Sequence, residues 1–201
     1  MQAFLALVDR LNGAGAEERA RVEAEIWDRF GVEKALLALD MSQFSLSVRR
    51  SGILPYLGLI RRMQMVTAPI VQRHGGAVVK YSADNMIAIF DTAADAAVAA
   101  VAINRAIVEG GERFQVAIGV DHGSFILIDG ADCYGDAVNV SCKLGEDVAA
   151  AGEILLTAAA RERLGEAFPH PLKEQRVSVS GLEVRVFAVE YFPGRIESSH
   201  E

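Results

Sequence analysis

The stretch Val78–Phe90, VVKYSADNMIAIF, decides the fold. Apolar residues stand on both sides of a short polar segment, a pattern typical of two strands joined by a tight turn near Ala83, Asp84 and Asn85. Charged side chains are rarely buried in a core unless a partner or ligand compensates them. Lys80 and Asp84 nevertheless stand at the centre of this hairpin. The stretch therefore predicts a core hairpin and raises the question of what its two charges bind.

The segments on either side of the hairpin alternate between strand and helix patterns. Residues 34–42, KALLALDMS, have the short apolar run of a buried strand, and residues 44–74 have helical spacing. Residues 91–110 form an Ala-rich helix pattern, and residues 114–128 read as a strand and a turn into a strand. The order strand, helix, strand, strand, helix, strand predicts an α+β fold with a ferredoxin-like βαββαβ core. Its antiparallel sheet would carry helices on one face and leave the other free to meet a second copy.

Further segments flank this core. A helical preface occupies residues 1–33, with its two parts separated by NGAG, and a polar tail occupies residues 194–201. The domain itself is predicted at residues 34–193. Its additions after the core are a helix at 135–152, a strand at 153–157 and a terminal hairpin at 176–190.

Composition excludes several classes of protein. A chain of 201 residues supports one well-buried core, and its net charge of -7 argues against a sequence-independent nucleic-acid binder, which needs a basic face. The two cysteines fit neither a CxxC redox pair nor a zinc site and suit a reducing compartment. The sequence has no apolar run of the roughly 18 residues that a membrane helix needs, and its start lacks a signal-peptide pattern. We expect a cytoplasmic protein without a membrane span.

Two aspartates stand at the ends of predicted neighbouring strands. Asp40 ends the first strand and Asp84 lies in the hairpin turn, so both carboxylates can converge at one end of the sheet. Asp84 alone is also explained as a turn residue, and Asp40 alone as the start of the next helix. Together, without histidine or cysteine, the pair favours a hard cation, Mg²⁺ or Mn²⁺, with the phosphates of a nucleotide as further ligands.

Three longer stretches share a resemblance. LALDMSQFS, GGAVVKYSADNMIAIF and VAIGVDHGS…DCYGDAVNVSCKLGEDVAAAGEILLT resemble the signature stretches of class III adenylyl/guanylyl cyclase catalytic domains, in that family's order and at its usual separations. The likeness runs from about Lys34 to Glu190. By this resemblance, Asp40 and Asp84 would hold two divalent ions, Mg²⁺ or Mn²⁺, in each site. The resemblance also implies the remaining ligands: the backbone carbonyl of Met41 for metal, and the amides around Gln43, Phe44 and Ser45 for the phosphates.

The same resemblance implies how the base is read. Lys80 falls on the purine-reading lysine of adenylyl cyclases, Asp132 on its acidic partner, and Asn139 on the asparagine that orients the ribose. A lysine donor and a carboxylate acceptor match the N1 and N6 edge of adenine, whereas guanine presents the reverse pattern, so the pair implies ATP. In the family the metal aspartates and the purine pair of one site come from different subunits. The resemblance therefore implies a homodimer with composite sites.

The implied reaction converts ATP to 3′,5′-cyclic AMP and pyrophosphate by in-line attack of the ribose 3′-hydroxyl on the α-phosphorus. Two departures from the family's pattern affect the positive charge available to this reaction. Lys143 stands where the family keeps a transition-state arginine, and lysine lacks the planar bidentate fork; a solvated surface lysine is the alternative interpretation. Ser180 stands where the family has a phosphate-gripping lysine, a cation that Lys173 or Arg176 would have to replace.

Smaller departures concern the backbone. Gln43 and Ala83 replace glycines, and Asp121-His122 replaces the usual His-Thr. Alanine resists the left-handed backbone angles that glycine permits, so Ala83 bears directly on the turn that holds Asp84. We interpret His122 as a turn residue.

Two functions from different classes stay open. The first is a homodimeric adenylyl cyclase, favoured because both metal aspartates, the purine pair and Asn139 are present. The second is a degenerate cyclase-fold module that binds nucleotide or a protein partner and acts through dimerisation, favoured by the missing phosphate cations and by Ala83. A diguanylate-type synthase is set aside because the YSADN turn lacks that family's glycine-rich acidic pattern.

Overall fold

The computed structural model describes residues 1–42, 53–179 and 181–191. Within these ranges eight strands form one sheet in the order β2-β3-β1-β4-β6-β8-β7, and β5 pairs with β4. The strands are β1 (Gly31–Met41), β2 (Ala77–Ser82), β3 (Asn85–Phe90), β4 (Val116–Ile128), β5 (Asp132–Tyr134), β6 (Ile154–Thr157), β7 (Leu172–Val179) and β8 (Leu182–Val189). The helices are α1 (Gln2–Gly13), α2 (Ala16–Phe30), α4 (Ile53–Arg73), α5 (Ala93–Glu109), α6 (Asp136–Lys143) and α7 (Ala158–Glu162), with one π-helical turn, η1 (Leu144–Val148).

The predicted βαββαβ order is confirmed, since β1, α4, β2, β3, α5 and β4 follow one another along the chain. Strand β1 lies between β3 and β4 and is antiparallel to both. The hairpin read from the sequence is β2 and β3, with an irregularity in register between Val78 and Lys80. Its turn contains Ala83 at φ +51°, the left-handed conformation that the missing glycine led us to expect. The predicted terminal hairpin is β7 and β8.

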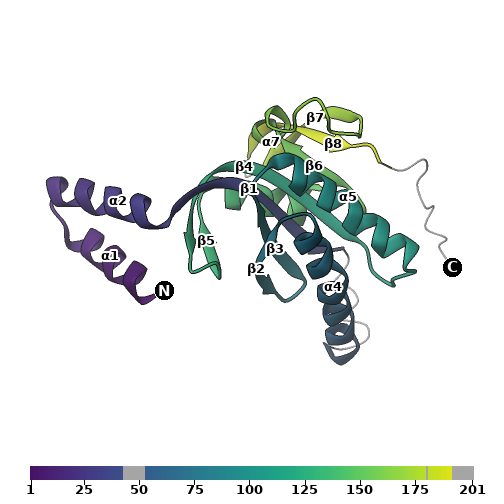
Figure 1. The fold of residues 1–201 in the computed structure, drawn as a ribbon, viewed down its shortest axis with the longest axis horizontal. Helices are drawn as coiled ribbons and strands as arrows, with labels where there is room; N and C mark the ends of the chain where they lie inside the picture. The colour runs from purple at the N-terminus through teal and green to yellow at the C-terminus, as the bar shows by residue number, and fades with distance from the viewer. Residues whose placement is uncertain (43–52, 180, 192–201) are drawn as a thin grey trace.

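Alternate residues of β1 separate the two faces of the sheet. Leu37, Leu39 and Met41 belong to the main core with α4 and α5, whereas Leu36 packs on the opposite face. There Ala137 of α6 belongs to the same cluster. Figure 1 shows α5 lying along one side of the long central strands. The expectation of a helix-free second face was therefore wrong in part, because α6 and η1 cover some of it.

Two glycines allow η1 to lie directly on the sheet. A β-carbon at Gly119 would come within 2.2 Å of the carbonyl oxygen of Ser141, and one at Gly145 within 2.9 Å of that of Ala38. Both are far closer than real β-carbon contacts, so only glycine fits at either position. The close approach fixes the end of α6 beside the carboxyl-terminal half of β1.

The predicted helical preface is a helical hairpin of α1 and α2, separated near residues 14–15. It projects from one end of the sheet (Figure 1). Leu7 and Val22 pack with Ile126 and Ile128 of β4, so the hairpin has its own small core against that strand. None of the described helices combines the length and apolar character required to cross a bilayer.

The prediction of a turn within residues 114–128 was wrong. Strand β4 runs unbroken from Val116 to Ile128 because it pairs with β1 along its length, from Met41–Val116 to Gly31–Ile126. Turn propensity at Asp121 and His122 is overridden by this ladder of backbone hydrogen bonds. His122 is consequently a mid-strand residue, not a turn residue.

Candidate active site

The two predicted metal aspartates lie at the same end of the sheet. Asp40 is the penultimate residue of β1 and pairs with Asn85, the first residue of β3. The backbone N–H of Met41 donates to the carbonyl oxygen of Asp84 at 3.2 Å. This bond ties the turn to the end of β1, so Asp40 and Asp84 lie at the same end of the sheet.

The surroundings of both carboxylates disfavour negative charge. Burial is the largest cause that raises the pKa of Asp40 to about 7. Repulsion from Asp84, Glu146 and Asp147 adds to it. Burial also raises the pKa of Asp84. A cation placed between them would reverse both effects. Among the described residues no group of three or more histidine, cysteine and acidic side chains is arranged to hold a metal, so the site offers the two carboxylates and backbone oxygen.

The end of α6 supplies further charge to this region. Asn85 donates through Nδ2 to Oε1 of Glu146 at 3.3 Å, and its own Oδ1 is buried without a hydrogen-bond partner. Lys143 lies one turn earlier and pairs with Asp147 at 3.3 Å. Burial is also the main cause of the raised pKa of Glu146. The ammonium of Lys143 is thus paired with η1 and lowers the pKa of Glu146 in part, beside the acidic groups that repel Asp40.

The predicted purine-reading pair is in direct contact. Nζ of Lys80 on β2 donates to Oδ1 of Asp132 on β5 at 2.6 Å, and their side chains are 38% and 20% exposed. The N–H of Cys133 donates to the same oxygen at 2.9 Å. The contact raises the pKa of Lys80 and lowers that of Asp132. Two residues 52 positions apart therefore present a donor and an acceptor together.

A cavity of 230 Å³ extends from Lys80 to Asn85 and Glu146, beside the acidic end of the sheet. Its lining residues are Ala38, Leu39, Lys80, Ser82, Asn85, Met86, Ile87, Cys142 and Glu146. Sites that enclose a whole small ligand usually measure about 300–1,000 Å³. The cavity is too small to enclose a nucleotide and fits one part of a larger site.

The other predicted residues are distributed around these two centres. Asn139 is exposed on α6, one turn before Lys143, and Met41 is buried at the end of β1. Arg176 on β7 pairs with Glu183 at 3.6 Å, on the surface of the terminal hairpin, and Lys173 lies on the same strand. The predictions for Gln43, Phe44, Ser45 and Ser180 lie outside the described residues.

Comparison with solved structures identifies the architecture. An adenylate/guanylate cyclase/hydrolase from Silicibacter pomeroyi is 29% identical, with a TM-score of 0.67 over 79% of this chain and 96% of its own. The chain has the fold of class III adenylyl/guanylyl cyclase catalytic domains. The cyclase fold is shared with the catalytic core of a rhodopsin-guanylyl cyclase of converted specificity, in complex with ATPαS, at 18% identity. That match has a TM-score of 0.68 and covers 80% of this chain and 97% of the other.

One further solved structure agrees with this fold, and the sequence comparison agrees over a smaller part of the chain. An adenylyl cyclase from P. aeruginosa shares the fold at 17% identity and a TM-score of 0.66, over 81% of this chain and 96% of its own. A curated protein of Rhizobium meliloti, provisionally named an adenylate cyclase, is 28% identical over 116 residues, 55% of this chain. The chain spans about a fifth of that relative's length, since the match covers 20% of it. No family model matches the sequence.

Sequence reasoning missed two residues of the candidate site. Glu146 lines the cavity, and Tyr134 donates through its hydroxyl to Oδ2 of Asp132 at 2.6 Å. Alternation along a strand puts residues i and i+2 on one side, so Asp132 and Tyr134 carried a readable signal once β5 was known to be a strand. Strand β5, with three residues, was too short to be predicted. Glu146 had no comparable signal, because it follows a helix that ends in a π-helical turn.

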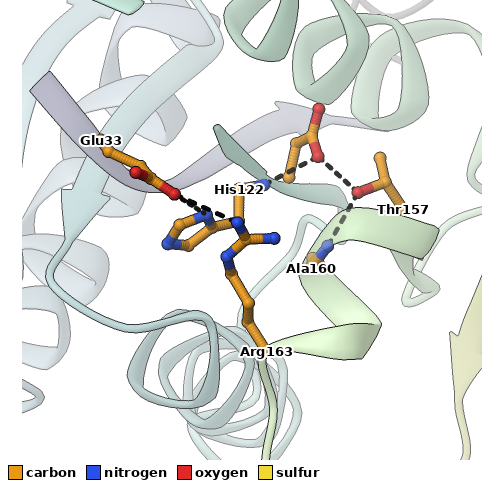
Figure 2. Close-up of polar contacts among 6 residues, drawn as sticks. Glu33, His122, Thr157, Ala160 and Arg163 are labelled. Carbon is orange, nitrogen blue, oxygen red and sulfur yellow. Dashed lines mark hydrogen bonds and ion pairs between the residues drawn. The ribbon is translucent and has the colours of Figure 1, made fainter. Parts of the chain in front are cut away.

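Asp121 and His122, which depart from the family's pattern, belong to a separate polar network (Figure 2). Buried Asp121 accepts hydrogen bonds from the Thr157 hydroxyl and from the His122 N–H, the latter at 2.7 Å. The Thr157 oxygen in turn accepts from the N–H of Ala160 at 3.1 Å and caps α7. His122 is only 9% exposed in its side chain, and burial lowers its pKa. The network joins β4, β6 and α7, and none of its residues lines the cavity.

Replacing Thr157 with valine is expected to lower the free energy of unfolding by about 2 kcal/mol, because one donor to a buried carboxylate and one helix cap are lost together. Chemical denaturation of the purified domain measures this change. Thr92 caps α5 by accepting from the N–H of Asp95 at 3.1 Å on the surface, so Thr92→Val is the matched control and should cost about 1 kcal/mol. Equal losses in the two variants would contradict a stabilising role for the Asp121 contact.

Proposed function

We propose that the cyclase domain is an adenylyl cyclase that converts ATP to 3′,5′-cyclic AMP and pyrophosphate. The observation that carries the proposal is the contact of Lys80 with Asp132 at 2.6 Å beside the cavity. The fold alone does not select a base, because its structural relatives include adenylyl and guanylyl cyclases. The choice of ATP therefore rests on the chemistry of this pair.

The pair presents one donor and one acceptor to a base. Lysine carries only donors and a carboxylate only acceptors, so Lys80 pairs with N1 of adenine while Asp132 accepts from its N6 amino group. Guanine has a protonated N1 and a carbonyl O6, which would face a donor and an acceptor in the wrong order. Unpaired polar groups in a closed site are costly, and the site should therefore prefer ATP.

The residues present fit a pair of hard divalent cations. Asp40 and Asp84 are oxygen ligands whose pKa values are raised by burial, and no described thiol or imidazole joins them. We propose that both carboxylates and the Met41 carbonyl hold Mg²⁺ or Mn²⁺, two ions per site. When bound, the ions would lower the pKa of the ribose 3′-hydroxyl and neutralise the triphosphate.

The remaining residues position the substrate. Asn139, exposed on α6, would orient the ribose, and Lys143 would stabilise charge on the α-phosphate after leaving Asp147. The amides around Gln43, Phe44 and Ser45 would bind the phosphates. A cavity of 230 Å³ is smaller than a nucleotide requires, which supports a site completed by a second copy. We propose a homodimer in which one subunit supplies Asp40 and Asp84 and the other supplies Lys80, Asp132, Asn139 and Lys143.

Mixing two inactive variants tests both parts of the proposal. Purified protein is incubated with ATP and Mn²⁺, then Mg²⁺, and cyclic AMP is quantified by chromatography. Asp84→Ala and Lys80→Ala should each lose nearly all activity when assayed alone. In a mixture, half of the dimers pair one variant with the other, and each has one of two sites intact. We expect about a quarter of the activity of the unaltered protein; no recovery would contradict shared sites.

If a confirmed dimer forms no product with either metal, the proposed enzymatic activity would be overturned. The degenerate binding module would then be favoured, and one observation already supports it, because Lys143 is paired with Asp147 and not free. The two free cysteines, Cys133 and Cys142, suit a reducing compartment, and we propose the cytoplasm.

Asp40 predicts that the stability of the domain depends on pH, and this dependence can be measured without catalytic activity. Its folded pKa of about 7 exceeds the ordinary aspartate pKa of 3.8, so the folded metal-free domain binds this proton more tightly than the unfolded chain. Stability contributed by the group is present below about pH 4 and is lost as pH rises toward 7. Metal needs the carboxylate, so added Mn²⁺ should raise the melting temperature more at pH 8 than at pH 6. Asp40→Asn should abolish this difference, and a difference that persists in the variant would contradict the assignment.

A further inference from the structure

We infer that Tyr134 is a positioning residue for base recognition, acting through Asp132, and that Phe4 of α1 holds Tyr134 in place. The inference rests on the proposed function, which assigns Lys80 and Asp132 to the base but gives Tyr134 and the helical preface no part. It makes the N-terminal helix a determinant of nucleotide specificity.

The Asp132 carboxylate is held at both of its oxygens. Oδ1 accepts from Lys80 and from the N–H of Cys133, while Oδ2 accepts from the Tyr134 hydroxyl at 2.6 Å. After Lys80, the Tyr134 hydroxyl is the next cause of the lowered pKa of Asp132. The tyrosine therefore stabilises the ionised carboxylate of Asp132. This is the form that accepts a hydrogen bond from an amino group of a base.

Tyr134 fixes the direction of the remaining acceptor site. Each carboxylate oxygen has about two lone-pair positions, so one hydrogen bond from Tyr134 leaves one position free on Oδ2. The torsion that turns a carboxylate about its Cβ–Cγ bond is broad and offers little restraint by itself. Without Tyr134, the carboxylate would turn more freely, and its acceptor would point at N6 for less of the time.

The ring of Tyr134 is in turn stacked on the preface. Phe4 and Tyr134 have centroids 6.2 Å apart and planes at 5°, and Phe30 at the end of α2 packs edge-on against Phe4 at 5.4 Å. Tyr134 is 51% exposed, so the Phe4 stack is one of few restraints on its ring. Aromatic pairs of this kind contribute beyond their buried area. The contacts form a continuous path from α2 through α1 to the carboxylate that reads the base.

Steady-state kinetics with ATP and GTP test the inference. Tyr134→Phe keeps the stack and loses the hydroxyl, and we expect KM for ATP to rise about fivefold while kcat changes less than about twofold. The preference for ATP over GTP should fall by about the same factor. Phe4→Ala should act in the same direction with a smaller effect. The two changes should not add, because both operate through one contact.

Two variants control for general damage. Tyr81 is the neighbour of Lys80, but its hydroxyl contacts Thr67 of α4 at 3.1 Å, so Tyr81→Phe removes a hydroxyl outside the base site. Leu5 lies next to Phe4 and is 50% exposed, so Leu5→Ala alters α1 and leaves both rings of the Phe4–Tyr134 stack in place. Both should leave the ATP-to-GTP ratio unchanged. An unchanged ratio in Tyr134→Phe, or equal changes in all four variants, would overturn the inference.

A second measurement separates this inference from the proposed function. If the unaltered protein forms no cyclic nucleotide, the proposed function fails, and the carboxyl carbon of Asp132 is then followed by NMR against pH. The pKa of Asp132 should rise toward its ordinary value in Tyr134→Phe, and should rise less in Phe4→Ala. A pKa that is unchanged in Tyr134→Phe would overturn the positioning role whatever the activity.

Discussion

Replacing Asp84 with alanine is expected to reduce cyclic AMP formation by about 10³-fold, because one of two carboxylates that fit the metal ions is lost where charge must be neutralised in the transition state. The stability of the metal-free domain should not fall. Burial raises the pKa of Asp84, and Asp84 repels Asp40, so its removal relieves an unfavourable charge. Activity is measured with Mn²⁺ and with Mg²⁺, and stability by chemical denaturation without metal.

Asp91 provides the matched control for this variant. It also follows a strand of the hairpin, β3, but it is 79% exposed and pairs with Lys34 at the opposite end of the sheet. Asp91→Ala should retain activity within about twofold. Comparable losses in the two variants, or loss of activity in Asp84→Ala with a matching loss of stability, would show that Asp84 supports the fold and not the reaction.

Replacing Lys80 with alanine is expected to lower kcat/KM for ATP by about 10²-fold and to reduce the preference for ATP over GTP. The effect should stay below the largest losses known for buried specificity groups, because the Lys80 side chain is 38% exposed and water can partly replace it. The variant also leaves Asp132 without its closest cation, so the pKa of Asp132 should rise toward its ordinary value.

Lys34 is the control for Lys80. It contributes an ammonium to an ion pair with Asp91, and neither residue lines the cavity. Lys34→Ala should leave both the rate and the choice of nucleotide unchanged. An ATP preference retained in Lys80→Ala would contradict the assignment of the purine pair and would move attention to residues outside the described part of the chain.

The hairpin and the residues it carries were predictable because their signals are local. Apolar runs on both sides of SADN define β2 and β3, and an aspartate at the end of a buried strand beside that turn predicts the meeting of Asp40 and Asp84. The left-handed turn at Ala83 followed from the residue type that normally occupies the position.

Other features depended on pairing that a single sequence does not display. The residues Asp121 to Ser124 have turn character, yet they continue β4 because β1 pairs with them. Tyr134 and Glu146 join the site only once β5 pairs with β4 and the glycine contacts bring η1 onto the sheet. Long-range contacts, not local propensity, decided each of these positions.

The absence of a linker between α2 and β1 has a consequence for folding cooperativity. Helix α2 ends at Phe30 and β1 begins at Gly31, and the ladder to β4 runs from Gly31–Ile126 to Met41–Val116. Opening either end therefore breaks one continuous set of backbone hydrogen bonds. The preface, the central strands and the acidic end of the sheet should protect their amides from hydrogen exchange as a single unit, whose opening approaches global unfolding.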